Sequence, residues 1–279
     1  MRFTALALAA VGASAGAMAD EQPGVSPWVE GFNNKVRLIA GFEPDFAGHA
    51  PRKVAGVEID LPPGWKTYWR APGDSGVPPE FDFSASENLK SAEVLYPAPH
   101  RLADRGGTNA GYKEHVIFPV MIAAADEAKP VHLKLKATFG ACKELCIPVE
   151  AELELPLPVE LNTSAAVNES LMAALANVPV AGAPPKLASW SIDRTGAKPK
   201  LVLQVEMPAD ATGGDAFVDI ADGTYLPVPK KVAEARAGAT YEVDLSVSGG
   251  VDIKTLKGKT IRVTLTSSII NSETGIKVE

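Results

Sequence analysis

Residues 131–157, VHLKLKATFGACKELCIPVEAELELPL, contain two stretches in which apolar and polar residues alternate. The first is apolar at Val131, Leu133 and Leu135, and the second at Val149, Ala151, Leu153 and Leu155. A period of two is typical of a β-strand with one face buried and the other in water. The stretch therefore predicts two neighbouring antiparallel strands, joined by the segment that carries the two cysteines of the chain.

One antiparallel register satisfies both faces of this predicted hairpin. It places Leu133 opposite Leu155 on the core face and pairs opposite charges on the outer face, a favourable cross-strand arrangement. The charge pairs are Lys134 with Glu154 and Lys136 with Glu152. The same register puts Cys142 opposite Cys146 on the outward face, so we expect both sulfurs to be open to attack. We also expect the pair to react slowly with bulky thiols, because neighbouring loops cover it. A β-bulge at Gly140 would shift this register near the tip.

The same alternation recurs over most of the chain and predicts an all-β fold. Further alternating runs occupy residues 57–61, 201–207, 241–247 and 261–265, and turn-rich stretches occupy residues 62–64, 71–76 and 104–109. Short strands separated by Gly and Pro turns are typical of antiparallel β-sandwiches. Residues 168–177 are rich in helix formers and predict one short helix, which a linker at residues 180–186 follows.

These patterns divide the chain into four expected segments. Residues 1–19 have the basic start, apolar run and Ala-Met-Ala end of a cleaved signal peptide. Residues 20–160 form a β-sandwich with the cysteine pair, residues 161–186 a short helix and linker, and residues 187–279 a second, smaller β-sandwich. We expect the second sandwich to be separable by proteolysis at the linker.

Charge and hydropathy argue against nucleic-acid binding and against membrane insertion of the mature chain. The formal net charge is −7 with both signs interspersed, whereas nucleic-acid binding requires a basic patch. After the signal segment no apolar run is long enough to cross a bilayer, which takes about 20 residues. We therefore expect an exported periplasmic protein that binds no nucleic acid and does not insert its mature chain into a membrane.

The cysteine spacing favours redox chemistry over stabilisation. A disulfide that closes about five residues stabilises a fold by only about 2 kcal/mol, against about 4.7 kcal/mol for a hundred-residue loop. Directly opposed strand residues also hold their Cβ atoms about 4.5–5.5 Å apart, whereas a relaxed disulfide prefers about 3.8 Å. A strained, accessible disulfide is easily reduced and tends to be catalytic or regulatory.

Two alternatives stay open for this pair. It is an inert clip that closes a turn, or a pair of thiolates that holds Cu(I) with a nearby Met or His. The four histidines have no regular ligand spacing, so no metal site and no cofactor is predicted; they are His49, His100, His115 and His132.

Three segments resemble a known family. They are GWKTYWR at residues 64–70, GYKEHVIFPV at residues 111–120 and GACKELCIP at residues 140–148. Together they resemble the periplasmic N-terminal domain of the thiol:disulfide interchange protein DsbD and of its relatives among suppressor-of-copper-sensitivity proteins. The resemblance covers about residues 35–160 and implies an immunoglobulin-like sandwich and a link to copper tolerance.

The resemblance also implies roles for particular residues and partners. Cys142 and Cys146 are the redox pair, and residues 102–112 lie where the family carries a cap over the sulfurs. The residues expected in the cap or in partner binding are Asp104, Tyr112, Tyr68 and Trp69. The implied partners are periplasmic thioredoxin-fold proteins, which receive electrons, and a separate membrane protein, which donates them.

Two functional hypotheses follow. The first is a stand-alone periplasmic thiol/disulfide relay, that is, a protein-disulfide reductase or interchange component that transfers electrons through Cys142 and Cys146. The second is a non-enzymatic binding module for a protein or for copper, in which the disulfide only clips a loop. A pair that stays oxidised throughout a redox titration and forms no mixed disulfide would favour the binding module.

Overall fold

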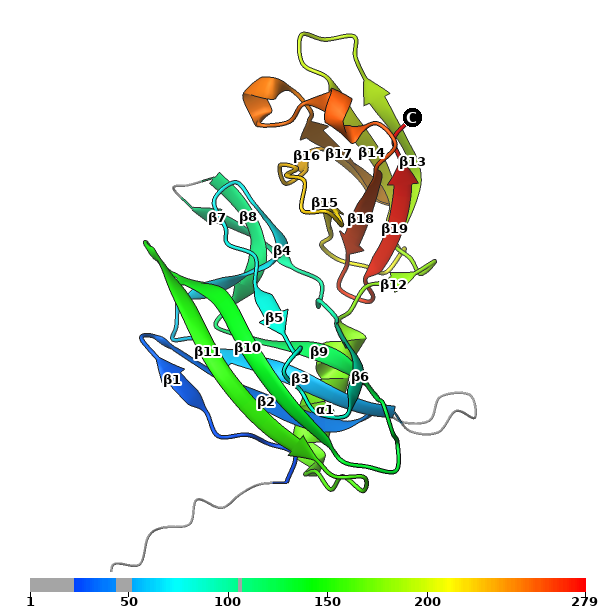
Figure 1. The fold of residues 1–279 in the computed structure, drawn as a ribbon. Coiled ribbons are helices and arrows are strands. Elements are labelled where there is room, and N and C mark those ends of the chain that lie inside the picture. Colours follow the sequence, from blue (N-terminus) through cyan, green and yellow to red (C-terminus); the bar gives the residue numbers. More distant parts are fainter. Residues whose placement is uncertain (1–22, 44–51, 105–106) are drawn as a thin grey trace, which may run out of the picture.

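The computed structural model describes residues 23–43, 52–104 and 107–279 (Figure 1). The expected signal peptide and its cleavage point lie outside these residues. The chain folds as two β-sandwiches that follow one another in sequence. We refer to residues 23–177 as the N-terminal sandwich and to residues 178–279 as the C-terminal sandwich.

The N-terminal sandwich consists of a five-stranded and a six-stranded sheet. The first sheet has the order β1 (Val29–Gly31), β2 (Asn34–Glu43), β3 (Arg52–Asp60), β9 (His115–Ala124) and β6 (Leu89–Val94). The second has the order β11 (Cys146–Leu157), β10 (Val131–Cys142), β4 (Lys66–Gly73), β8 (Gly107–Lys113) and β7 (His100–Asp104), and β5 (Glu80–Asp82) also pairs with β10. All pairings within these two sheets are antiparallel.

The core of this sandwich lies between the two sheets and explains the alternation in the sequence. Leu133, Leu135, Leu153 and Leu155 point from β10 and β11 into one buried cluster with Phe118 of β9. The charged residues between them point the other way. The hydrophobic period of two therefore gives the orientation of the hairpin directly.

The short helix α1 (Ala165–Ala176) belongs to the N-terminal sandwich rather than to a linker. Ser164 caps its first turn by accepting a hydrogen bond from the backbone N–H of Val167. Leu171 is fully buried against Ile39 and Ile117 on the outer face of the five-stranded sheet. The prediction of one short helix is confirmed, and the helix accounts for strand residues that are buried on both faces of this sheet.

The C-terminal sandwich has two four-stranded sheets around a separate core. One has the order β12 (Val180–Ala181), β19 (Ser272–Lys277), β18 (Thr260–Thr266) and β15 (Asp215–Ile220). The other has the order β13 (Lys186–Asp193), β14 (Lys200–Glu206), β17 (Gly238–Asp244) and β16 (Lys230–Ala235). The prediction of an all-β fold with a second β-sandwich is confirmed.

The two sandwiches meet through β15, which lies against β4 and β7. Arg70 of β4 pairs with Asp219 at 3.1 Å, and Arg101 of β7 pairs with Asp215. Phe217, between these two aspartates, packs edge-on against Trp69 with ring centroids 5.9 Å apart. Charged and aromatic contacts therefore join the two sandwiches.

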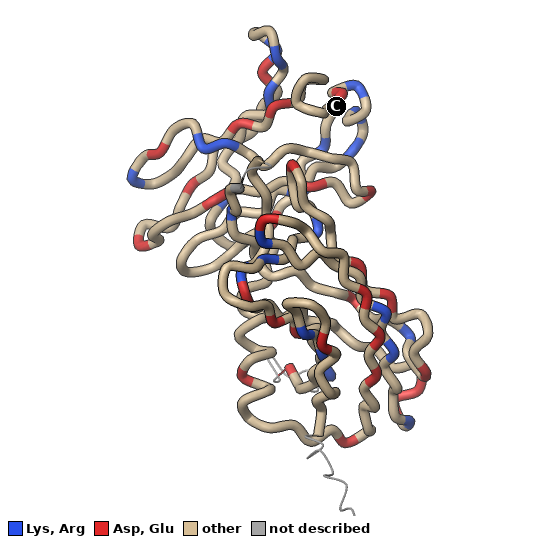
Figure 2. The backbone as a smooth tube through the Cα atoms, turned by 90° about the vertical axis from the view of Figure 1, so that its left-hand side faces the viewer, with Lys and Arg blue, Asp and Glu red and all other residues tan. Residues whose placement is uncertain are grey.

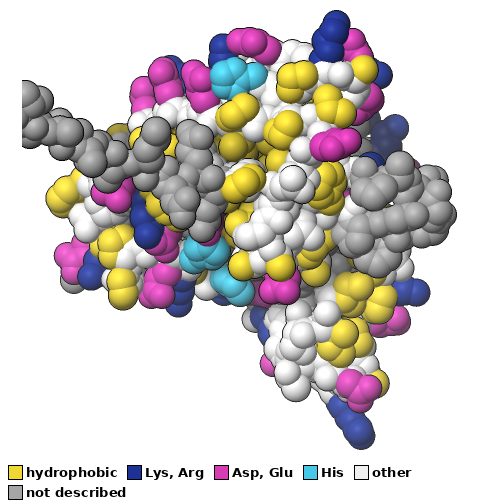
Figure 3. Space-filling view, turned by 90° about the horizontal axis from the view of Figure 1, so that it is seen from below, with side chains coloured by type: hydrophobic (Ala, Val, Ile, Leu, Met, Phe, Trp, Pro, Cys, Tyr) yellow, Lys and Arg dark blue, Asp and Glu magenta, His cyan; other side chains and the backbone are white. Residues whose placement is uncertain are grey.

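Acidic and basic residues are interspersed along both sandwiches (Figure 2). The face seen from below shows the same mixture, with hydrophobic side chains gathered in small groups between the charges (Figure 3). In the described part of the chain, no helix is both long enough and apolar enough to cross a membrane.

Candidate redox site

The cysteine hairpin has the register that its sequence predicts. Leu133 faces Leu155, Lys134 faces Glu154, and Cys142 faces Cys146, with an unbroken ladder from Val131–Leu157 to the tip. Gly140 pairs with Pro148 in this ladder and forms no bulge. The pattern of charged and apolar residues in this stretch therefore predicts the pairing of the two cysteines correctly.

The two cysteines form a disulfide but differ in accessibility. Their Cα atoms are 4.1 Å apart across the hairpin end. Cys146 is exposed, whereas Cys142 is only 1% exposed. The expectation that both sulfurs are open to attack is thus wrong for Cys142, because other parts of the chain cover the outward face of β10 at this point.

Tyr68 and Val77 cover Cys142 by filling the space above Gly140. A Cβ atom at position 140 would lie 3.4 Å from Sγ of Cys142, 3.5 Å from Cε2 of Tyr68 and 3.5 Å from Cβ of Val77. Three side chains therefore meet beside Gly140, at distances that an added methyl group would tolerate.

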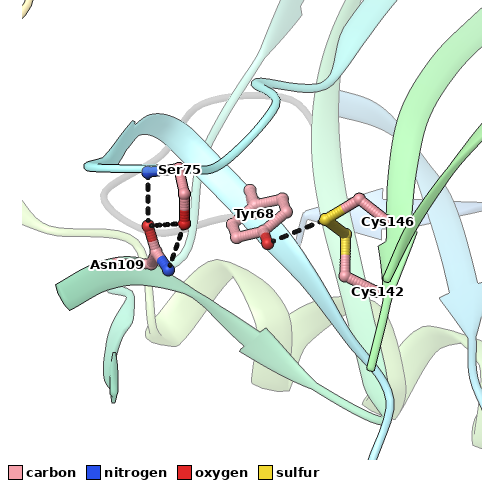
Figure 4. The surroundings of a disulfide bond; sticks show 5 residues. All are labelled: Tyr68, Ser75, Asn109, Cys142 and Cys146. Atoms are coloured by element: carbon pink, nitrogen blue, oxygen red, sulfur yellow. Dashed lines mark hydrogen bonds between the residues drawn. A yellow bond between two sulfur atoms is a disulfide. The ribbon is translucent and has the colours of Figure 1, made fainter. Parts of the chain in front are cut away.

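Tyr68 also makes a polar contact with the disulfide. Its hydroxyl lies 3.2 Å from Sγ of Cys146 and donates to it, because a disulfide sulfur has no proton to give (Figure 4). Tyr68 is 1% exposed and comes from β4, whose Lys66 pairs with Cys142. A hydroxyl fixed at this distance is placed to stabilise a thiolate on Cys146 when the disulfide opens.

A loop lies on the opposite side of the Tyr68 ring from the disulfide (Figure 4). We call residues 74–79, which join β4 to β5, the cap loop. A Cβ atom at Gly76 would lie only 2.7 Å from Cδ1 of Tyr68, so the backbone of the loop rests on the ring. Asn109, which is fully buried, holds the loop by accepting a hydrogen bond from the N–H of Ser75 at 3.0 Å.

The cover over the sulfurs thus differs from the one expected at residues 102–112. That segment forms the β7–β8 hairpin, and its Asn109 supports the cap loop from behind. The sequence does not predict the cap loop. Its Pro and Gly content signals a turn, but nothing local shows that the turn folds back over a tyrosine.

The structure brings one of the four other expected site residues to the disulfide, namely Tyr68. Trp69 and Tyr112 lie in the buried core of the N-terminal sandwich. The Tyr112 hydroxyl donates to the carbonyl of Pro97 at 2.7 Å, and burial raises its pKa well above the ordinary value. Asp104 ends β7, at the opposite end of the β7–β8 hairpin from the residues that flank Cys142.

Two lysines bring positive charge to the hairpin tip. Lys143 follows Cys142, and its side chain lies against Gly64 of the neighbouring turn. Nζ of Lys66 lies 6.0 Å from the centre of the Tyr68 ring. Positive charge near a cysteine favours its thiolate, but Glu144 carries a negative charge in the same tip and opposes this effect. Among the residues that the structure describes, no cluster of three or more His, Cys, Asp or Glu side chains is arranged to hold a metal ion.

Comparison with known sequences finds a family match over the residues of this site. Residues 37–158 match the family described as thiol:disulfide interchange protein DsbD, N-terminal. This part of the chain is similar to DsbD N-terminal domains. The match spans the strands from β2 to β11 and includes both cysteines, Tyr68 and the cap loop. The N-terminal sandwich is thus similar to the N-terminal domain of a thiol–disulfide interchange protein.

A solved structure is similar to a larger part of the chain than residues 37–158. The crystal structure of the N-terminal periplasmic domain of ScsB from Proteus mirabilis has a TM-score of 0.70 and 23% sequence identity. The alignment covers 92% of this chain and 99% of that one, so both sandwiches share its fold. No curated protein matches the chain significantly in sequence.

Proposed function

We propose that this protein is a periplasmic thiol/disulfide relay that transfers two electrons through Cys142 and Cys146. The observation that carries the proposal is the difference in exposure between the two cysteines, in a segment that matches the DsbD N-terminal family. Cys146 is exposed and accepts a hydrogen bond from Tyr68, whereas Cys142 is buried. One sulfur is thus placed to meet a partner and the other to complete the exchange.

In the reduced protein the Cys146 thiolate attacks a disulfide of the partner. A bond forms between Cys146 Sγ and one partner sulfur, and the other partner sulfur leaves as a thiolate. Cys142 then attacks Cys146 Sγ, restores the Cys142–Cys146 disulfide and releases the partner as a dithiol. A dithiol on a separate membrane donor reduces the pair again by the same exchange in reverse.

The partner class follows from the family rather than from a contact in the structure. A thioredoxin-fold protein of the periplasm is the proposed acceptor, since the DsbD family carries out thiol–disulfide interchange. Export through a cleaved signal peptide at residues 1–19 is part of the same proposal. A role in copper tolerance is also part of the proposal, and it rests on the resemblance of residues 64–70, 111–120 and 140–148 to suppressor-of-copper-sensitivity proteins.

Trapping of the mixed disulfide tests the proposal. In Cys142→Ser the attack by Cys146 still occurs but nothing resolves it, so a covalent adduct with a periplasmic protein accumulates. Cys146→Ser is the matched control and gives little adduct, because the remaining thiol is buried; the double variant gives none. Non-reducing electrophoresis of periplasmic extracts, followed by mass spectrometry of the adduct, is the measurement.

Two results would favour the binding module instead. One is the absence of any reducible adduct in both single variants. The other is a wild-type protein that keeps its disulfide throughout a glutathione titration. Together they would leave the Cys142–Cys146 bond as a clip in the hairpin.

A further inference from the structure

The C-terminal sandwich contacts the cap loop, which packs on Tyr68 beside the buried Cys142. Residues 221–229 join β15 to β16 and lie against the start of the cap loop. The Tyr225 hydroxyl donates a hydrogen bond to Oδ1 of Asp74 at 2.8 Å. A Cβ atom at Gly73 would lie 2.7 Å from Cγ2 of Val228, so the valine packs directly on this glycine. Val228 is 9% exposed and forms part of the core of the N-terminal sandwich.

Asp74 connects this contact to the rest of the site. Its second oxygen, Oδ2, accepts a hydrogen bond from the backbone N–H of Thr108 at 2.9 Å. The carboxylate is therefore shared between β8 of one sandwich and Tyr225 of the other. Burial and the hydrogen bond to Asp74 raise the pKa of Tyr225 to about 12, so its hydroxyl keeps the proton that it donates at neutral pH.

The cap loop in turn limits the movement of Tyr68. Gly76 lies against the Cδ1–Cε1 edge of the ring, and the opposite edge faces Gly140. The hydroxyl at the end of the ring contacts Sγ of Cys146. Tyr68 cannot swing away from the sulfurs unless the loop rises at Gly76.

We propose that Tyr225 and Val228 of the C-terminal sandwich are positioning residues: they hold the cap loop on Tyr68, keep the Tyr68 hydroxyl on Sγ of Cys146, and so set the rate at which a thiol reaches that sulfur. The inference rests on the proposed exchange at Cys142 and Cys146. Neither residue touches the sulfurs; each acts through Gly73 and Asp74 at the root of the loop. The C-terminal sandwich, which has no cysteine of its own, thereby has a function in the exchange.

The expected effect follows from the strength of the contact. When the Tyr68 hydroxyl must leave Sγ of Cys146 before a thiol attacks it, the rate of reduction is proportional to the population of the open loop that lets the ring move. Loss of one hydrogen bond to a charged group, partly exposed here, should raise that population about threefold to tenfold. Removal of the Val228 methyl groups from Gly73 acts in the same direction.

Reduction of the oxidised, full-length protein by dithiothreitol measures this effect without a biological partner. A dithiothreitol thiolate bonds to Cys146 Sγ while Cys142 leaves as a thiolate; the second dithiothreitol thiol then closes a ring and frees Cys146. We expect Tyr225→Phe to be reduced about threefold to tenfold faster than wild type, and Val228→Ala to be faster as well. Tyr241→Phe is the control, because it removes a hydroxyl that donates to Gly214 within the same sandwich.

A double-variant cycle separates positioning from general loosening. In an Asp74→Ala background Tyr225→Phe should cause no further acceleration, because the acceptor is already gone. A Tyr225→Phe rate equal to wild type, or an equal acceleration in Tyr241→Phe, would overturn the inference. Neither result affects the trapping experiment with Cys142→Ser. Failure of the positioning role of Tyr225 and Val228 can therefore be distinguished from failure of the proposed relay.

Discussion

Tyr68 is the residue on which the chemistry of Cys146 depends most directly. Its hydroxyl lies within hydrogen-bond distance of that sulfur, at 3.2 Å. A neutral donor stabilises a thiolate more than a thiol, because the negative charge strengthens the bond. The tyrosine therefore favours the form of Cys146 that attacks a partner.

Tyr68→Phe should slow the reaction of Cys146 without unfolding the protein. In a Cys142→Ser background, where Cys146 is the sole thiol, we expect alkylation by iodoacetamide at pH 7 to slow about fivefold. The phenyl ring keeps its packing, so the cause is loss of the donor. Tyr112→Phe is the control, since that hydroxyl bonds to Pro97 in the core. An unchanged or faster rate in Tyr68→Phe would contradict the assigned role.

At the scale of elements, the β10–β11 hairpin contrasts with the β4–β8 pair beside it. A methyl group added at Gly140 of β10 would make only ordinary contacts, the nearest at 3.4 Å. Gly111 of β8 instead leaves room for the backbone of β4, because a Cβ atom there would lie 2.3 Å from the carbonyl oxygen of Thr67. Close packing thus requires glycine at position 111 but not at position 140.

Alanine substitution should reveal this difference. Gly111→Ala must push β8 from β4 and should lower the free energy of unfolding by about 1–3 kcal/mol, the usual cost of overpacking. Gly140→Ala should leave it unchanged or raise it by up to about 1 kcal/mol, because alanine restricts the unfolded chain. Urea denaturation followed by tryptophan fluorescence measures both. Equal destabilisation by the two variants would show that position 140 is also tightly packed.

The sequence predicts the hairpin well because its information is local. Register, charge pairing and the opposition of Cys142 and Cys146 all follow from residues within the single stretch 131–157. The burial of Cys142 does not follow, since Tyr68 and Val77 reach it from distant parts of the chain. Alternation shows which face a residue points to, but not what later covers that face.

The position of the cap loop also could not be predicted from the sequence. The family resemblance predicts a cap in the Gly-rich segment near residues 103–111. In the fold this segment pairs as β7 and β8, and the shorter loop at residues 74–79 takes the place over Tyr68. Long-range contacts, such as Asn109 with Ser75, decide between two turn-rich segments that look equivalent in sequence.

At the scale of the whole molecule, a buried ionic cluster joins the two sandwiches. Arg70 of the N-terminal sandwich pairs with Asp219 and Glu273, and Arg262 of the C-terminal sandwich shares Asp219. The side chain of Asp219 is 4% exposed and that of Arg70 is 16% exposed. Burial would lower the pKa of Arg70, but Asp219 and Glu273 raise it above the ordinary value, so the cluster holds its charges.

This cluster bears on the prediction that residues 187–279 form a separable sandwich. Each sandwich has its own core, but Phe217 and Val228 of the second pack into the first. Separation would expose these side chains and leave Arg70 without its carboxylates. The expected linker at residues 180–186 includes β12 and the first residue of β13, so only residues 182–185 lie between strands. We therefore expect a cut there to leave the two sandwiches associated.

Arg70→Ala tests the interface directly. Removal of one partner of a buried ion pair leaves charge uncompensated and costs about 3–5 kcal/mol, and we expect a value near the lower end because Arg262 still contacts Asp219. Arg52→Ala is the control: its pair with Glu43 is exposed, so its loss should cost at most about 1 kcal/mol. Urea denaturation gives both values.

The same loss at the interface should also free the C-terminal sandwich from the cap loop, so Arg70→Ala should be reduced faster by dithiothreitol than Arg52→Ala. A destabilised Arg70→Ala protein whose disulfide is reduced at the wild-type rate would show that the interface supports the fold but does not control access to the sulfurs.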